Sequence, residues 1–326
     1  MEIKTLIPEY LKHLHSLNRS PFTLRDNRYI LQRFMRFLEK EQVFDLQALT
    51  LEVLEDYQQD LAFSLTAKGG LLAIRTQVKA LDTVKCFTRF LKDKDYLVHD
   101  PGAKIKLPKE PKPLPKVILS LEEVQKLLKA PDMQTNRGYR NRVILEILYD
   151  TAIRRNEMTH VRLPDLDLEA GFIHIRQGKG DKERVVPLSQ RVCGLVKNYV
   201  LAVRSSFIQG DDSGHLVLNR WGRKMDPMAV WAVVHACAKL AGLKSRISTH
   251  TLRHTCATHM LRNGAPIRHI QEMLGHESLE TTQLYTRVTI NDLKEIHAKY
   301  HPSEKMIVKG ETSNVKSKEQ KKFRQD

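Results

Sequence analysis

The first hundred residues carry apolar side chains at helical spacing in four successive segments. Within each segment they recur every three or four positions, which places them on one face of a helix. The four sets are Ile7, Tyr10, Leu11 and Leu14; Tyr29, Ile30, Phe34, Phe37 and Leu38; Leu51, Leu54, Tyr57 and Leu61; and Ile74, Val78, Leu81, Val84, Phe87 and Leu91. No strand-like alternation interrupts them, so the pattern predicts a small helical bundle.

A stretch rich in proline and lysine, between His99 and Lys116, breaks this pattern. Prolines stand at positions 101, 108, 111, 113 and 115. Closely spaced prolines cannot continue a helix and favour an extended spacer. We therefore expect a helical domain over residues 1–100, a linker over 101–116 and a second domain over 117–302.

Helix signals resume directly after this stretch. Ser120 and Glu123 form a capping box that opens a helix. Asp226 followed by Pro227 is an N-cap with proline at the first helical position, and this helix should run to about Leu240. Further helices are expected at about 141–150, 250–262, 266–274 and 279–286, with Gly264 and Gly275 as C-terminal stops.

Strand-like runs are few. Residues 172–175 and 184–188 are mainly apolar and flank a polar turn that contains glycine, which predicts a β-hairpin. Residues 216–218 are a candidate third strand. The predicted fold class is mainly α, with an N-terminal helical bundle and a mainly helical second domain that holds a small antiparallel sheet.

Charge narrows the class of partner. The chain has 326 residues, enough for two cores, and a formal net charge of +16. Such a charge indicates a polyanionic partner, most commonly nucleic acid, although membrane-surface binders are also basic. Lysine and arginine run through the predicted helices and also fill the tail 303–326, which we expect to be disordered and to add nonspecific DNA affinity. In the first domain, the polar helix faces carry Arg25, Arg28, Arg33, Lys79 and Lys85, either as a solvated face or as DNA contacts.

The cysteines and the apolar runs point to a cytoplasmic protein. Cys86, Cys193, Cys237 and Cys256 are far apart and lack C-x-x-C spacing, so they are expected to be reduced core thiols rather than disulfide or zinc ligands. The first residues do not resemble a signal peptide, and no apolar run approaches the length of a membrane span.

The candidate chemistry is concentrated between residues 250 and 285. His250 and Arg253 are three positions apart, His276 stands in a Leu-Gly-His string, and Tyr285 follows nine residues later. Fixed cationic donors stabilise the extra charge of a phosphodiester transition state, and they also favour the oxyanion of a nearby phenol. The segment therefore predicts a phosphoryl-transfer site with a tyrosine nucleophile.

A metal site is the competing interpretation of the same segment. His250 and His254 have the i, i+4 spacing of a ligand pair, and Cys256 and His259 are close in sequence. The segment lacks the glutamate of the zincin motif and an obvious third ligand. We therefore expect no metal and no cofactor.

The strings 249–261 and 273–286 closely resemble the two C-terminal boxes of the tyrosine recombinases, also called the phage integrase family, and most closely its Xer-type members. Arg154 and Glu157 resemble the family's first-arginine box, with Ala152 where glycine is usual and with Arg155 as a second arginine beside the first. The resemblance implies that Arg154 binds the phosphate and that Glu157 holds Arg154.

The remaining roles also come from the resemblance. It implies that Tyr285 is the nucleophile and that His250, Arg253 and His276 stabilise the transition state together with Arg154. Lys179 in the hairpin turn would be the general acid, with Lys182 as its rival in the same turn.

The resemblance further implies a site-specific recombinase that forms a 3′-phosphotyrosyl intermediate without a metal or ATP. The first domain would bind core DNA and the second would carry catalysis, so that together they clamp duplex DNA in the cytoplasm at the nucleoid. Four protomers would assemble on two DNA sites, two per site, as a homotetramer or with a paralogue, and residues 291–300 would dock on a neighbour. The alternatives are a type IB topoisomerase, a metal-dependent nuclease and a catalytically silent DNA-binding regulator.

Overall fold

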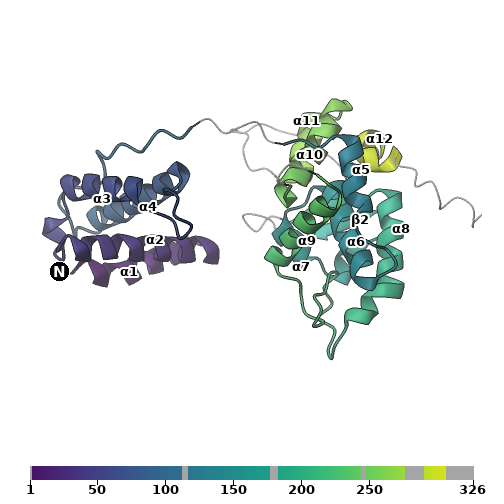
Figure 1. The fold of residues 1–326 in the computed structure, drawn as a ribbon, viewed down its shortest axis with the longest axis horizontal. Helices are drawn as coiled ribbons and strands as arrows, with labels where there is room; N and C mark the ends of the chain where they lie inside the picture. The colour runs from purple at the N-terminus through teal and green to yellow at the C-terminus, as the bar shows by residue number, and fades with distance from the viewer. Residues whose placement is uncertain (1, 112–116, 177–182, 244–246, 276–289, 306–326) are drawn as a thin grey trace, which may run out of the picture. The chain divides into compact units, whose positions relative to one another are not determined.

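The structure is a computed structural model that describes residues 2–111, 117–176, 183–243, 247–275 and 290–305. The chain divides into two compact units, Met1–Leu114 and Pro115–Asp326 (Figure 1). Each unit has its own hydrophobic core. Within the described residues, no helix is long and apolar enough to cross a membrane.

The N-terminal unit contains the four predicted helices. They are α1 (Ile3–Ser16), α2 (Pro21–Lys40), α3 (Leu51–Phe63) and α4 (Ile74–Asp93), with a 3-10 turn η1 (Leu46–Ala48) before α3. Two of them begin at polar caps, since Ser20 accepts a hydrogen bond from the Thr23 N–H and Thr50 accepts one from the Val53 N–H. The sequence prediction of a helical bundle is confirmed.

Aromatic side chains fill the centre of this bundle. Tyr10 of α1 packs against Phe87 and Phe90 of α4, with ring centroids 5.4 and 5.3 Å apart. Tyr57 of α3 packs against Phe34 of α2 at 4.8 Å. These tilted and edge-on contacts join α1 to α4 and α2 to α3.

The start of the predicted linker packs on the N-terminal unit. Ile105 is buried in its core, and the Lys85 ammonium donates to the Ile105 carbonyl at 2.9 Å. At Gly102, a Cβ would come within 2.4 Å of the Thr88 hydroxyl, so only glycine fits there. Residues up to Ile105 therefore belong to the first unit, and Lys85 holds this segment although its position on a polar helix face suggested a DNA contact.

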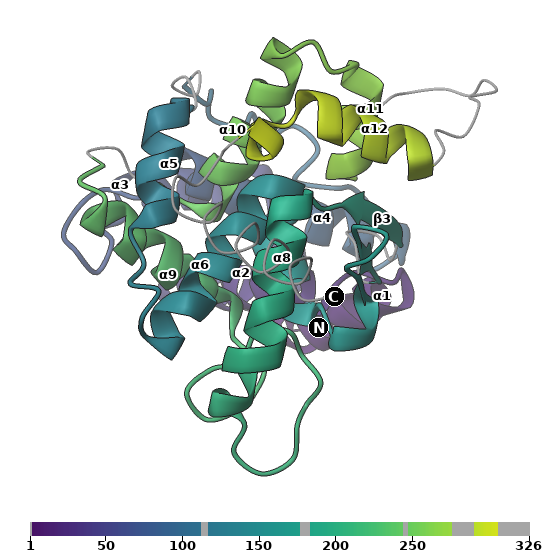
Figure 2. The ribbon, with the colours of Figure 1, turned by 90° about the vertical axis from the view of Figure 1, so that its right-hand side faces the viewer.

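The second unit consists of helices and a small sheet. Its helices are α5 (Leu121–Lys129), α6 (Asn136–Thr151), α7 (Arg155–His160), α8 (Gln190–Asn198), α9 (Pro227–Leu240), α10 (Thr249–Arg262), α11 (Ile267–Leu274) and α12 (Ile290–Tyr300). Its short turns are η2 (Leu163–Asp165), η3 (Tyr199–Val203), η4 (Arg204–Phe207) and η5 (Pro302–Lys305). Helix α6 packs against α5, α8, α9 and α10, while α12 lies beside α11 and strand β3 (Arg184–Pro187) (Figure 2).

The capping predictions for this unit are confirmed. Ser120 and Glu123 make both bonds of the capping box at the start of α5. Asp226 caps α9 by accepting from the Met228 N–H, and Gly275 ends α11 with φ at +61°. The helix predicted at 279–286 lies outside the described residues.

The sheet has three antiparallel strands in the order β1-β2-β3. The predicted hairpin is confirmed as β2 (Phe172–Ile175) and β3, with Ile173 opposite Val186. The third strand of the sheet is β1 (Leu166–Asp167), which pairs with β2. The prediction that residues 216–218 form this strand is therefore wrong. Residues 216–218 are apolar since the core buries them, and the Leu216 N–H bonds to the Val161 carbonyl instead of to a strand of the sheet.

Two further predictions are corrected. Helix α6 starts at Asn136 rather than near 141, because the Thr135 hydroxyl caps it by accepting from the Gly138 N–H. Glycine is needed at position 138, since a Cβ there would collide with the Asp132 carbonyl. The prediction that all four cysteines are core thiols holds for three, whereas Cys86 on α4 is exposed.

Candidate active site

Arg154 lies at the junction between α6 and α7. Helix α6 ends at Thr151 and is followed by Ala152, whose left-handed φ of +51° explains why glycine is usual at this position. Arg154 is the N-cap of α7; its backbone N–H donates to Glu157 at 2.8 Å and its guanidinium donates to the same carboxylate at 2.9 Å. Arg155 instead contacts the sulfur of Met228 on α9. Of the two adjacent arginines, Arg154 is the one held by Glu157.

Arg253 reaches the same junction from α10. It is 8 % exposed, and its two terminal nitrogens donate to the carbonyls of Ala152 and Leu274, each at 2.6 Å. Burial, and after it the neighbouring charge of Arg154, lower the pKa of Arg253 to about 10. The side chain still carries its charge at neutral pH, and both contacts fix its plane.

Arg184, the first residue of β3, completes the cluster and was not singled out from the sequence. Its terminal nitrogens donate to both oxygens of Glu157, at 3.0 and 2.7 Å, and its Nε donates to the Met273 carbonyl at 3.1 Å. An arginine beside a lysine-rich turn gives no local signal of such a role, because Glu157 and Met273 are far from it in sequence.

The three guanidiniums meet three successive carbonyls at the end of α11. Arg184 binds the Met273 carbonyl, Arg253 binds that of Leu274, and Arg154 binds that of Gly275 at 3.0 Å. Carbonyls at a helix C-terminus lack partners within the helix and carry partial negative charge, so cations are stabilised there. The arginines thereby fix the chain immediately before His276.

Glu157 balances part of this positive charge. Burial alone would raise its pKa, but hydrogen bonds from Arg184 and Arg154 outweigh burial and hold the pKa of Glu157 below its usual range. The carboxylate is therefore ionised at neutral pH. One anion among three cations leaves the cluster with net positive charge, which suits a phosphate.

The other predicted site residues are only partly placed. His250 lies in the first turn of α10, one turn before Arg253, and is exposed. Lys179, Lys182, His276 and Tyr285 lie outside the described residues.

The competing metal interpretation finds no support in the described ranges. There, no set of three ligand side chains that could share one ion includes His250, His254, Cys256 or His259. His259 instead bonds to the Tyr149 hydroxyl at 2.9 Å, and the sulfur of Cys256 is 3.3 Å from His301.

Known proteins resemble this chain over most of its length. Residues 118–291 match the model of the phage integrase family. The chain is 33 % identical over 301 residues to tyrosine recombinase XerD of Staphylococcus haemolyticus, an alignment that covers 92 % of this chain and 99 % of the relative. It is 36 % identical over 281 residues to tyrosine recombinase XerC 2 of Ralstonia nicotianae, covering 86 % and 81 %.

A solved structure shares the fold. It is the lambda integrase tetramer bound to a Holliday junction, with a TM-score of 0.65 and 16 % identity over 85 % of this chain and 75 % of that one. The family model covers more than half of the sequence, and relatives above 30 % identity align with most of it. The chain therefore belongs to the phage integrase family, as a Xer-type tyrosine recombinase that carries out site-specific DNA recombination.

Proposed function

We propose that Tyr285 cleaves DNA by attacking the scissile phosphate, which forms a 3′-phosphotyrosyl bond and releases a 5′ hydroxyl. The observation that carries this proposal is the placement of Arg154 and Arg253 on consecutive carbonyls directly before His276. Attack of a 5′ hydroxyl on the phosphotyrosine reverses the step and frees Tyr285. The phosphodiester energy is kept in the covalent link, so neither ATP nor a metal is required.

The arginines would supply the electrostatic part of catalysis. Each guanidinium has five N–H donors, more than the contacts described above occupy, and its planar fork matches two phosphate oxygens. Because Glu157, Ala152 and Leu274 already fix the guanidiniums of Arg154 and Arg253, little reorganisation is needed when negative charge develops. His250 and His276 would add further donors, and Lys179 would protonate the leaving 5′ oxygen.

Duplex DNA is the proposed partner, bound by both units. The net charge of +16 favours a polyanion, and Arg25 and Arg28 are exposed on α2 of the N-terminal unit. The lambda integrase of similar fold is a tetramer on a Holliday junction. We infer an assembly of four protomers on two sites, two per site, either of this chain alone or with a paralogue.

The first experiment tests the nucleophile and finds the target site. Cells that express the full chain are lysed in SDS, covalent protein–DNA adducts are captured, and the attached DNA is sequenced. Tyr285→Phe should abolish the adduct while DNA binding persists, because it removes only the attacking oxygen. Tyr29→Phe, at an exposed tyrosine of α2, is the matched control and should form the adduct normally.

This experiment also separates the alternatives. Adducts formed by Tyr285→Phe would refute the nucleophile assignment. A complete lack of adducts from the unaltered chain would favour a silent DNA-binding regulator. Adducts spread over the genome, with relaxation of supercoils, would favour a topoisomerase.

The second experiment tests the general acid on the site so identified. Lys179→Ala should slow cleavage by roughly 100- to 10,000-fold, because the 5′ oxygen then leaves as an alkoxide. A substrate with sulfur in place of that oxygen needs little protonation, so it should restore cleavage by Lys179→Ala but not by Tyr285→Phe. Failure of sulfur to rescue Lys179→Ala, with rescue of Lys182→Ala instead, would assign the role to Lys182.

A further inference from the structure

A pocket of about 330 Å³ lies in the second unit beside the arginine cluster, and the cleavage step proposed above does not use it. Glu157 forms part of its wall, so the pocket and the cluster share this carboxylate. The other polar residues that line it are one acid, two arginines and three histidines, namely Asp165, Arg162, Arg176, His160, His174 and His215. Such a lining favours an anionic ligand.

The backbone turns these side chains toward one face. Arg162 and His215 are opposite each other in a short antiparallel pair, in which the Leu216 N–H donates to the Val161 carbonyl at 2.8 Å. Because Val161 and Leu216 are buried in the core, the alternation of extended chain points Arg162 and His215 to the other side together. On β2, His174 is likewise exposed between two buried isoleucines. The lining is therefore built by two pieces of extended chain and the end of α7.

The two acids of the pocket are already paired. Glu157 accepts hydrogen bonds from Arg154 and Arg184. Asp165 accepts from Nε of Arg176 at 2.5 Å. Among the described residues no third acid lines the pocket. Any further cation at this place therefore adds net positive charge.

Arg162 and Lys224 are such cations, and both are exposed. The Lys224 ammonium donates to Nε2 of His160 at 2.9 Å. Nδ1 of His160 lies 2.7 Å from the Asn156 carbonyl, which can only accept, so His160 is neutral with its hydrogen on Nδ1. The imidazole thus fixes the ammonium at the edge of the pocket without cancelling its charge. The bond uses one of the three N–H donors of Lys224.

His215 experiences the resulting positive potential. Burial, and after it the charges of Arg162 and Lys224, lower the pKa of His215 below its usual value. His215 is therefore a neutral imidazole at neutral pH. The neighbouring cations repel one another, and an anion in the pocket would relieve that repulsion.

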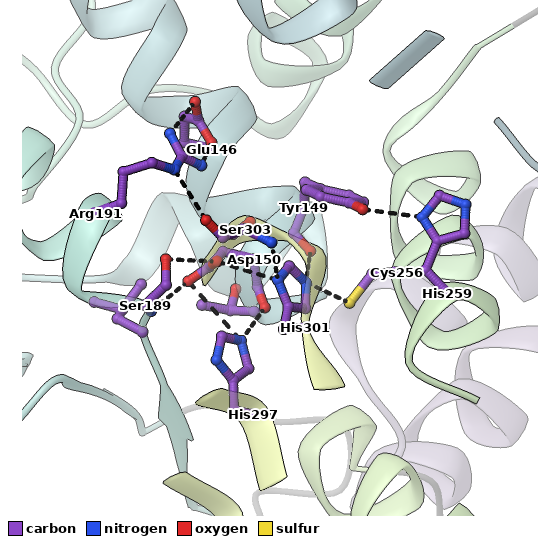
Figure 3. Close-up of polar contacts among 12 residues, drawn as sticks. Glu146, Tyr149, Asp150, Ser189, Arg191, Cys256, His259, His297, His301 and Ser303 are labelled. Carbon is purple, nitrogen blue, oxygen red and sulfur yellow. Dashed lines mark hydrogen bonds and ion pairs between the residues drawn. The ribbon is translucent and has the colours of Figure 1, made fainter. Parts of the chain in front are cut away.

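A second group of histidines in the same unit has no such capacity (Figure 3). His297 donates from Nε2 to the Asp150 carbonyl at 2.8 Å. His301 lies between the Tyr149 carbonyl at 3.2 Å and the Ser303 N–H at 3.1 Å. Both rings are at most 1 % exposed, and these protein groups satisfy them. The histidines around Glu157 differ because they line a space that a ligand can enter.

We propose that this pocket binds a non-scissile phosphate of the DNA backbone through Arg162, Lys224 and His215. His160, which ends α7, is six residues after Arg154, or about 9 Å along the helix axis. Since one DNA strand carries a phosphate about every 3.4 Å of its axis, the bound phosphate lies within about three positions of the one that Tyr285 attacks. The pocket thereby sets the register of the strand on the arginine cluster.

This inference rests on the proposed function, but the affinity for duplex DNA tests it without cleavage. Arg162→Gln and Lys224→Gln each remove one exposed charge. Loss of one phosphate contact should make the slope of log K against log salt shallower by about 0.9, so binding should be about eightfold weaker at about 0.1 M salt. Duplexes of unrelated sequence should lose the same factor. Lys197→Gln, at an exposed lysine of α8, is the matched control and should change neither quantity.

Neutral methylphosphonates locate the contacted phosphate. They are placed one at a time, on either strand, around the cleavage site found by adduct sequencing. At one position the substitution should weaken binding of the unaltered chain about eightfold and should not weaken binding of Lys224→Gln further, because the same contact is already lost. At the other positions the two losses should multiply. At saturating DNA, the unaltered chain should cleave the first of these substrates about tenfold more slowly, because the strand has lost its register.

Arg162→Lys and Lys224→Arg separate contact from folding. Both retain the charge, so both should keep the salt slope of the unaltered chain. Equal slopes for the glutamine variants and the unaltered chain would overturn the proposal, as would losses that multiply at every methylphosphonate position. A chain that forms no covalent adduct but shows the predicted slopes would refute only the proposed function.

A free phosphate compound is the other source of the same chemistry. Inorganic phosphate and ATP are titrated into the full chain without DNA, and the imidazole NMR signals of His215 are followed. Duplex DNA should shift these signals, and Lys224→Gln should weaken that response. A saturable shift with ATP or phosphate that duplex DNA does not reproduce would overturn the assignment to the DNA backbone.

Discussion

The N-terminal unit and the C-terminal unit, for which we propose catalysis and which we call the catalytic unit, are both mainly helical, but their cores contain different chemistry. Among the described residues of the first unit, the buried polar side chains are the uncharged Gln77, Thr83 and Thr88. Its charged pairs, such as Lys79 with Asp26, lie on the surface. The core of this unit is therefore formed by apolar and aromatic packing without a buried charge among the described residues.

The catalytic unit buries charges in several places. Glu146 is fully buried between Arg142 and Arg191, and Glu157 is buried between Arg154 and Arg184. A buried charge is costly unless it is paired and hydrogen-bonded, so each of these groups is held in one arrangement. The two units thus differ in that buried ion pairs fix side chains in the second unit, among them Arg154 and Arg184 of the proposed phosphate site, whereas apolar packing fills the core of the first.

Removal of a buried carboxylate should have the largest effect. Glu146→Ala takes the shared anion from Arg142 and Arg191, whose nitrogens lie 2.6 Å from it. We expect a loss of about 3–5 kcal/mol in the free energy of unfolding of the catalytic unit, measured by urea denaturation. A loss under 1 kcal/mol would mean that buried charges do not distinguish the two cores.

A cavity in the N-terminal core should cost slightly less. Leu54 of α3 is fully buried. Leu54→Ala should lower the free energy of unfolding by about 2–5 kcal/mol, seen as faster hydrogen exchange in α1 to α4. Cleavage chemistry on bound DNA should be unaffected, since this unit supplies none of the proposed catalytic groups. If Leu54→Ala slowed cleavage while the protein folded normally, the N-terminal unit would contribute to the chemical step, contrary to this prediction.

Arg184→Lys tests whether geometry matters beyond charge. Lysine keeps the positive charge but cannot bind both oxygens of Glu157 and the Met273 carbonyl together. We expect single-turnover cleavage to fall by roughly 100-fold, with DNA affinity within about twofold. Arg204→Lys is the matched control, because Arg204 is also buried and binds Asp212 at 2.6 and 2.7 Å outside the cluster. If Arg184→Lys and Arg204→Lys lost the same activity, the effect at Arg184 would come from protein stability and not from its position in the arginine cluster.

The smallest effect is expected at the surface of the N-terminal unit. Asp26 is 43 % exposed and pairs with Lys79 on α4. Asp26→Asn should change the free energy of unfolding by less than about 1 kcal/mol, because solvent and salt screen this pair. The effect should shrink further in 1 M salt, and a loss comparable to that of Glu146→Ala would contradict the contrast between the units.

Local patterns in the sequence determined much of this protein. The four helices of the first unit follow from apolar spacing, and the caps at Ser120 and Asp226 involve partners only two or three residues away. The family boxes name Arg154, His250 and Arg253 because they are short, contiguous strings. Each of these signals depends on neighbours in the chain, so the sequence alone carries it.

Tertiary structure decided the rest, because the relevant partners are distant in sequence. Arg184 gains its role from Glu157 and from the end of α11, and nothing near residue 184 indicates either contact. Strand β1 is only two residues long and exists because β2 pairs with it. His301 and Asp150 are separated by most of the catalytic unit, and only packing of α12 against α6 buries them together. Long-range pairing of buried polar groups depends on which surfaces the fold brings into contact, and no local pattern specifies that.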